Sequence, residues 1–165
     1  MKLRVSATLP VLAIGILVAA GAGASVFLKE DVGSLKKASE AVVHAKVVDI
    51  SSYWNADRTL IFTDVRLEVK GKLHGSAGAE IVVRVPGGTV GDFTVDMEGA
   101  PRFAMDDEVV AFIGRWHDGA PMVAGYFQGI SRVERDGLGN AFLRGGAADG
   151  LPMSELARML RQSGR

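Results

Sequence analysis

The sequence contains no cysteine among its 165 residues. Disulfides, thiolate metal sites, cysteine nucleophiles and a lipid-modified N-terminal cysteine are therefore excluded. An excess of one charge is absent as well, since 19 basic residues balance 19 acidic residues. Residues 1–24 contain Lys2 and Arg4 and no acid, so a chain that begins at Ser25 is slightly acidic. Binding of nucleic acid needs clustered Lys and Arg, so no nucleic-acid partner is expected.

What is present is the composition of a globular protein. Hydrophobic residues make up 48% of the chain and charged residues 23%, which excludes a disordered chain. The length corresponds to one folded domain. We expect a signal peptide at residues 1–24, a β-barrel domain at residues 25–144, and a linker with a C-terminal helix at residues 145–165.

The first 24 residues have the three parts of an export signal. Lys2 and Arg4 form a positive start, and Leu9 to Ala20 form an apolar stretch. Ala22-Gly23-Ala24 is a small-residue cleavage site, with cleavage expected before Ser25. This pattern predicts that the mature protein is periplasmic or secreted.

An uncleaved membrane anchor is the alternative for the same region. The stretch from Val5 to Leu28 contains no charged residue and is long enough to span a bilayer. A membrane contact is expected only under this interpretation. Both interpretations place the globular part outside the cytoplasm.

Two long strands are expected between Thr59 and Val85. The segment Ile61 to Lys70 alternates apolar and polar residues strictly, as a half-buried strand requires. A second alternating arm, Glu80 to Val85, follows a Gly-rich connector over Gly71 to Gly78. Consecutive strands usually pair, so an antiparallel pair is predicted. The residues expected to point inward are Ile61, Thr63, Val65, Leu67, Val69, Ile81, Val83 and Val85.

Two other segments, Val42 to Ser51 and Glu108 to Trp116, are apolar on both faces. This predicts a central strand for Glu108 to Trp116, and for Val42 to Ser51 either a central strand or a strand at a barrel closure. A turn is expected over Ser52 to Arg58, and an irregular segment over residues 87–107. Within residues 87–107, short extended pieces are expected near Phe93 to Val95 and Phe103. Shorter strands are expected at the end of the domain. They are Met122 to Phe127, Ile130 to Arg135 and Asn140 to Arg144, with a bulge at Gln128-Gly129.

Helices are expected before and after these strands. Ser34 to Ala41 reads as a short helix with Ser34 as its N-cap. Pro152 to Gln162 follows a Gly/Ala linker, and its apolar stripe should dock on the strands. About seven strands with turn signals at short intervals predict an all-β fold, an OB-like β-barrel with one helix on either side of the strands in sequence.

Four segments in this order resemble the netrin-like module, the OB-type barrel that is shared by tissue inhibitors of metalloproteinases. The segments read SEAVVHAKVVDISS, TDVRLEVKGKLHG, IVVRVPGG and MDDEVVAFIG. The likeness covers about residues 38–135, and the chain is also similar to a group of small exported bacterial proteins with this layout. The resemblance implies an extracellular OB-type barrel. The inhibitors use a free N-terminal cysteine, which this chain lacks, so no inhibitory site is implied.

A carboxylate-rich part of the irregular segment is a candidate metal site. Ca²⁺ takes several oxygen ligands and accepts a flexible loop. The spacing matches no EF-hand, so a solvated acidic loop is the competing interpretation. The candidate ligands are Asp92, Asp96, Glu98, Asp106 and Asp107, with Glu108 next to them.

The same segment is the candidate partner-binding loop. A rigid barrel that presents a Gly-rich loop can bring its backbone close to an extended chain. Nearby aromatic residues either form a binding patch or pack into the core. The candidate partner-binding residues are Pro86, Gly87, Gly88, Gly91, Phe93 and Arg102, with Tyr53, Trp54 and Phe62.

Catalytic motifs are not found in the chain. His44, His74 and His117 are far apart in sequence and match no metal-ligand spacing, and there is no G-x-S-x-G elbow. We therefore expect no enzyme activity, no catalytic residue and no cofactor. The predicted function is an exported module that recognises a protein or peptide, such as an exported hydrolase. The alternatives are a membrane-anchored structural domain of the cell envelope, and a calcium- or small-ligand-binding module.

Overall fold

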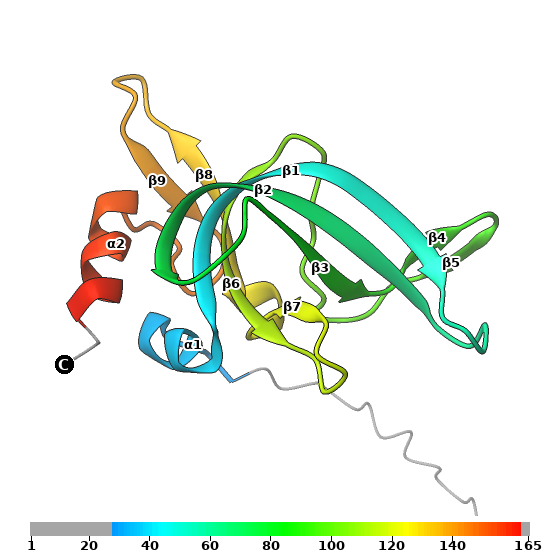
Figure 1. Cartoon of the computed structure of the whole chain (residues 1–165). Coiled ribbons are helices and arrows are strands. Elements are labelled where there is room, and N and C mark those ends of the chain that lie inside the picture. Colours follow the sequence, from blue (N-terminus) through cyan, green and yellow to red (C-terminus); the bar gives the residue numbers. More distant parts are fainter. Residues whose placement is uncertain (1–27, 163–165) are drawn as a thin grey trace, which may run out of the picture.

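The computed structural model describes residues 28–162, so the predicted signal peptide lies outside the described residues. Within this range, strands account for 47% of the residues, and two α-helices and one 3₁₀ helix complete the fold (Figure 1). A mostly β fold is therefore confirmed. No helix in residues 28–162 has the length and apolar character needed to cross a membrane.

Three long strands form one side of the sheet: β1 (Ala41–Trp54), β2 (Ile61–Gly75) and β3 (Glu80–Pro86). All pairs are antiparallel, and β2 and β3 pair with Val65 opposite Val83. The predicted alternation is confirmed, because the residues expected to point inward are buried or pack against the buried core.

Both β1 and β2 are longer than the sequence predicted. The expected turn from Ser52 is strand as far as Trp54, and the expected connector from Gly71 is strand as far as Gly75. These boundaries were wrong because the two strands satisfy each other's backbone groups, and Trp54 pairs with Ile61 while Ala41 pairs with Gly75.

The remaining strands extend the sheet on the other side of β1. The order is β3-β2-β1-β6-β8-β9, with β7 also paired to β6. The bounds are Glu108–Arg115 for β6, Pro121–Val123 for β7, Ile130–Arg135 for β8 and Ala141–Arg144 for β9. The central position predicted for β6 is confirmed, and of the two positions left open for β1 the central one is observed.

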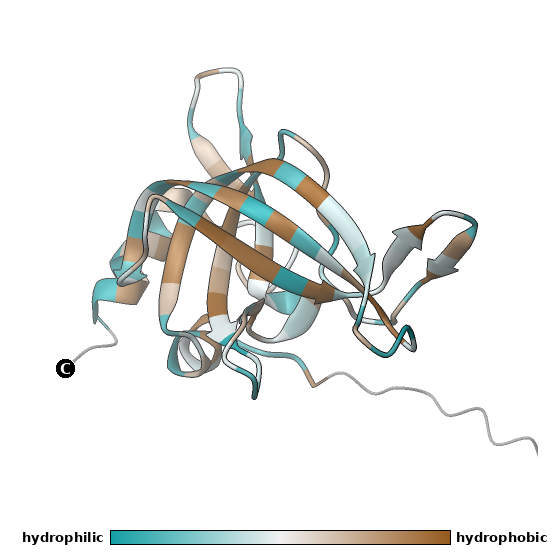
Figure 2. Ribbon diagram, turned by 45° about the vertical axis from the view of Figure 1, so that its right-hand side comes forward, coloured by the Kyte–Doolittle hydropathy of each residue, from teal (hydrophilic) through white to brown (hydrophobic). Residues whose placement is uncertain are grey.

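The sheet is strongly curved (Figure 2). Each of its faces packs against a separate core. The inner face carries Val43, Val65, Val83 and Val109, all 1% exposed or less. The outer face is covered by the two helices, α1 (Val32–Ala38) and α2 (Met153–Gln162). The two apolar faces of β1 and β6 are explained by these two cores.

On the outer face, α1 begins two residues earlier than predicted. Asp31, not Ser34, is its N-cap, and the Asp31 carboxylate accepts a hydrogen bond of 2.8 Å from the backbone N–H of Ser34. The predicted docking of α2 is confirmed, because Leu156 and Leu160 are buried in the outer core. The buried Lys36 ammonium donates to the carbonyl of Leu160 at 2.5 Å, which joins the two helices.

The sheet does not close into a barrel by strand pairing. The predicted strand Met122 to Phe127 is only three residues of β7 followed by the 3₁₀ helix η1 (Tyr126–Gly129). Gly125 and Tyr126 both have positive φ angles, 71° and 55°, which ends the extended backbone. No strand therefore bridges β7 to the free edge of β3, and the predicted closed barrel is not confirmed.

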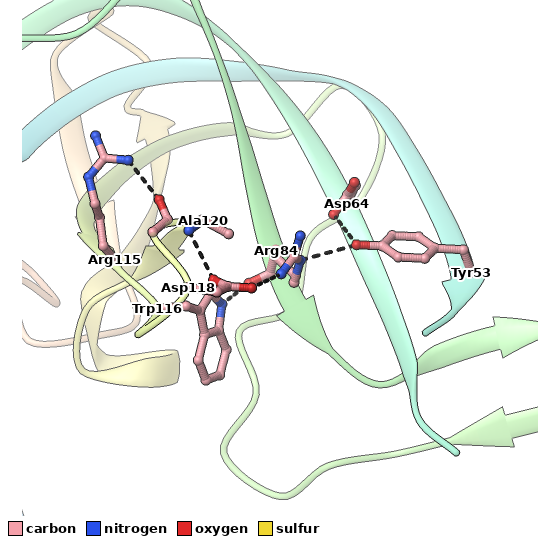
Figure 3. A network of polar contacts seen from close by, with 8 residues as sticks. Tyr53, Asp64, Arg84, Arg115, Trp116, Asp118 and Ala120 are labelled. Atoms are coloured by element: carbon pink, nitrogen blue, oxygen red, sulfur yellow. Dashed lines mark hydrogen bonds and ion pairs between the residues drawn. The ribbon is translucent and has the colours of Figure 1, made fainter. Parts of the chain in front are cut away.

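Side chains bridge this gap instead (Figure 3). The indole N–H of Trp116 donates to the carbonyl of Arg84 in β3 at 3.2 Å. The guanidinium of Arg84 in turn donates to Asp118 at 2.7 Å and to the Tyr53 hydroxyl at 3.1 Å. Tyr53 donates to Asp64 at 3.0 Å, so the network joins β1, β2 and β3 to the turn between β6 and β7.

The docking of α2 predicts a large effect of one core residue. Leu156→Ala should lower the free energy of unfolding by about 3 kcal/mol, because it leaves a cavity under the helix. The control is Arg158→Ala on the exposed side of α2, which should change it by less than about 0.5 kcal/mol. Urea unfolding followed by circular dichroism measures both. Equal effects of the two substitutions would contradict the docked position of α2.

Candidate functional site

Residues 96–103, which we call the strap, lie against the inner face of the sheet. Ala100 and Phe103 pack on the inner core, and Pro101 is buried. The backbone N–H of Phe127 donates to the carbonyl of Gly99 at 3.0 Å, which ties the strap to η1. The strap is thus held along its length by packing and by a main-chain bond.

The chain that follows the strap is tied to β1. The N–H of Asp106 donates to the carbonyl of Val47 at 3.1 Å, and the N–H of Val47 donates to the carbonyl of Asp107 at 2.9 Å. The Asp107 carboxylate also accepts from the N–H of Ala104 at 3.0 Å. Irregular backbone was expected here, and these bonds give it one defined course.

The segment before the strap is a hairpin. Its strands are β4 (Gly88–Val90) and β5 (Phe93–Val95), joined by Gly91 and Asp92. The extended piece expected near Phe93 to Val95 is confirmed as one of these strands, and the other strand was not predicted. Gly91 has a φ angle of 59°, which is the conformation that a two-residue hairpin turn needs. The ring of Phe93, 64% exposed, meets Trp54 edge-on with 5.7 Å between centroids.

A hollow of about 310 Å³, the first hollow, lies between the strap and the inner face. Its floor is apolar and is formed by Ile50, Val65 and Val85 from β1, β2 and β3. Four of the predicted partner-binding residues line it together: Pro86, Gly87, Gly88 and Arg102. The apolar floor was missed from the sequence, because the same alternation describes any buried strand.

The two glycines on its rim bring the main chain close to the sheet. A Cβ at Gly87 would lie 2.7 Å from the carbonyl oxygen of Val95, and one at Gly88 would lie 2.2 Å from Thr63 Oγ1. Thr63 Oγ1 donates to the carbonyl of Gly87 at 2.7 Å. Glycine is therefore required at both positions by the close approach of the backbone.

The predicted aromatic residues do not gather at this hollow. Tyr53 and Phe62 are opposite each other in the β1–β2 register and pack together with 6.4 Å between ring centroids. Arg84 lies over the Phe62 ring at 5.6 Å. Burial raises the pKa of the Tyr53 hydroxyl, and its bond to Asp64 raises it further. Tyr53 thus belongs to the network of Figure 3, and Phe62 packs beside it. Gly91 and Phe93 belong to the hairpin, which Trp54 contacts from the end of β1.

A second hollow of about 560 Å³ lies on the other side of the strap. Ala100 and Arg102 line both hollows, so the two are adjacent. Arg132 of β8 and Arg144 of β9 line the second hollow from the sheet, and the 42%-exposed ring of Phe127 lines it from η1. Arg132 and Arg144 were not predicted from the sequence, since no motif or spacing marks them.

The candidate calcium ligands are dispersed into ion pairs. Asp96 pairs with Arg102 at 2.9 Å, Asp106 with Lys46 at 2.8 Å, and Asp107 with Arg132 at 2.9 Å. Asp92 lies in the hairpin turn, and Glu98 lines the second hollow. Within residues 28–162, no group of three or more His, Asp and Glu side chains comes together to hold an ion.

Glu108 is at the centre of the tightest charged group outside the hollows. Its carboxylate contacts Arg135 at 2.6 Å and His44 at 2.5 Å. These three residues come from β6, β8 and β1, so the group joins three neighbouring strands. The hydrogen bonds from Arg135 and then from His44 outweigh burial and lower the pKa of Glu108 to about 2.

The chain was compared with known protein families, with curated proteins and with solved structures. None of them matches it. The resemblance to the netrin-like module stays a prediction for this reason. The two hollows together present an apolar floor, a main-chain rim with two glycines, and three arginines.

The rim of the first hollow predicts that Gly88→Ala is strongly destabilising. Its φ angle of 137° and the close approach to Thr63 should together cost about 2–3 kcal/mol of unfolding free energy. Gly137→Ala is the control, because its Cβ meets nothing within 4 Å and its φ is ordinary; about 0.5 kcal/mol or less is expected. Urea unfolding of the purified variants measures both free energies. If Gly88→Ala did not lower the free energy of unfolding, the close approach of Gly88 to Thr63 would be contradicted.

The Glu108 group predicts a pH-dependent contribution to stability. Folding lowers the pKa of Glu108, so the contribution is complete above the unfolded value near 4.5 and is lost as pH falls toward 2. With exposed partners, Glu108→Gln should cost about 1–2 kcal/mol at pH 7 and less than about half of that at pH 3.

Urea unfolding at several pH values measures this difference between the wild type and Glu108→Gln. The control is Glu155→Gln, whose carboxylate lies 3.4 Å from an exposed arginine, and it should have almost no effect at either pH. A cost of Glu108→Gln that is the same at pH 3 and pH 7 would contradict the lowered pKa.

Proposed function

We propose that this protein is an exported binding module that recognises an extended peptide segment of a protein partner at the first hollow. Export is supported by the pattern of residues 1–24, and binding by the hollow itself. We also propose that the curved sheet is an open form of an OB-like, netrin-like barrel. The side-chain bridge between Arg84 and the turn after β6 supports this, because it lies where a closing strand pair would be.

The observation that carries the proposal is the apolar floor of the first hollow. Ile50, Val65 and Val85 belong to the inner face and line the space that the strap leaves; Val65 and Val85 are buried, and Ile50 is partly exposed there. A volume of about 310 Å³ is at the small end of ligand pockets and accepts one or two large side chains. A buried apolar side chain of the partner would gain the free energy of leaving water there.

The position of the first hollow favours a peptide over a compact small molecule. Its rim is main chain with a fixed course, since Gly87 is buried, its N–H donates to the carbonyl of Ile61 and its carbonyl accepts from Thr63. An extended chain can place one side chain in an apolar pocket and continue along the surface, and such side chains give specificity. Met97, 39% exposed, lines the same hollow and adds an adaptable apolar contact.

The hollow is formed before any partner arrives. The strap is held by Ala100 and Phe103, and the hairpin is held by contact between Trp54 and Phe93. Thr63 fixes the carbonyl of Gly87, and the Ser52 hydroxyl bonds to Thr63 at 2.8 Å. A site that is ordered in advance loses less conformational entropy on binding.

Panning a random peptide library on the purified full chain tests this proposal. Selected peptides should share a large apolar residue and should bind Met97→Asn about five- to tenfold more weakly, as expected for the loss of about 1 kcal/mol of apolar contact. The control is Met105→Asn, which is 53% exposed and outside both hollows, and which should bind like the wild type.

Two outcomes of this experiment contradict the proposal. One is the absence of any enriched peptide. The other is equal binding of the enriched peptides to Met97→Asn and to the wild type, measured by fluorescence anisotropy, since the peptides would then bind elsewhere.

A further inference from the structure

The second hollow is lined by an excess of positive charge. Three guanidinium groups line it, with Glu98 as the opposing carboxylate. Each arginine has a carboxylate partner, but none of these partners lines the hollow. The pairs are Arg102–Asp96, Arg132–Asp107 and Arg144–Glu134.

Two of these arginines are directly opposite each other on neighbouring strands. Arg132 of β8 is the register partner of Arg144 of β9. Like charges directly opposite in a sheet are destabilising, and both side chains are more than half exposed, at 53% and 56%. The ion pairs with Asp107 and Glu134, and the Phe142 ring that lies 4.9 Å from the Arg144 guanidinium, offset part of this repulsion, and an anion between the two guanidiniums would offset it further.

The second hollow continues the first along the same face of the sheet. Val109 is an inner-face residue and pairs with Arg132, so Arg132 points to the inner side, as does its register partner Arg144. Arg102 on the strap lines both hollows. A chain seated in the first hollow therefore meets guanidinium groups where it passes the strap. An extended chain advances about 3.3 Å per residue, so only a few residues separate the two positions.

We propose that the second hollow binds Asp or Glu side chains of the same peptide that the first hollow holds. This inference rests on the proposed function and specifies its ligand: an extended segment with a large apolar residue and acidic residues close to it. Guanidinium groups suit this task because their planar N–H donors match a carboxylate in pairs. The open shape of the hollow suits a passing chain better than an enclosed small anion.

The composition of peptides selected from the random library is the first readout. Asp and Glu should be enriched within about two to five residues of the apolar anchor, as the strand spacing requires. Replacing the acids of a selected peptide by Asn or Gln should weaken binding about fivefold in low salt and less than about twofold in 0.5 M NaCl, since exposed ion pairs are screened.

Arginine variants locate the effect. Arg132→Gln and Arg144→Gln should each weaken the acidic peptide about fivefold and leave its neutral version unchanged, a coupling that only a direct interaction produces. Arg158→Gln on α2 is the matched control and should bind both peptides like the wild type. Thermal melting of each variant checks that the fold is kept.

The possible results separate this inference from the proposed function. Apolar enrichment without acidic enrichment overturns the inference and leaves the peptide-binding function in place. Acidic peptides that bind Arg132→Gln and Arg144→Gln as tightly as the wild type overturn it too, because the acids would then bind elsewhere. Absence of any selected peptide overturns both proposals.

Discussion

The structure depends on how far β1 can pair with both of its neighbours. β1 pairs with β2 along its whole length, but with β6 only from Ala41 to Lys46. A bulge between Val47 and Asp49 follows, and the chain before β6 turns away at Asp106, whose φ angle is 66°. Beyond Lys46, β1 is therefore no longer paired with β6 on that side.

The strap, the hairpin and the two hollows follow from that mismatch. Apolar inner-face residues such as Ile50 and Val65 still have to be covered, and residues 96–103 cover them in part. The strap does not pair with the sheet as a strand. It contacts the inner core through a few side chains, such as Ala100 and Phe103. Space remains on either side of the strap, and this space forms the two hollows.

The charged side chains are of two kinds: some connect segments of the sheet to one another, and others line the hollows. Arg84 and Glu108 each connect three or more segments, and their bonds are satisfied within the fold. Arg132 and Arg144 also have partners, yet they are opposite each other across a strand pair. The concave side therefore holds both hollows of the proposed peptide site, whereas Tyr53 and Phe62 pack around Arg84.

The sequence by itself determined the strand-rich class, the inward residues of β2 and β3, the central place of β6, and the docking helix α2. Those follow from local periodicity, which reports burial directly. Strand ends, the hairpin at Gly91, the open sheet and the pairing of Arg132 with Arg144 were decided by tertiary structure. Each depends on which distant backbone lies alongside, and periodicity carries no information about register.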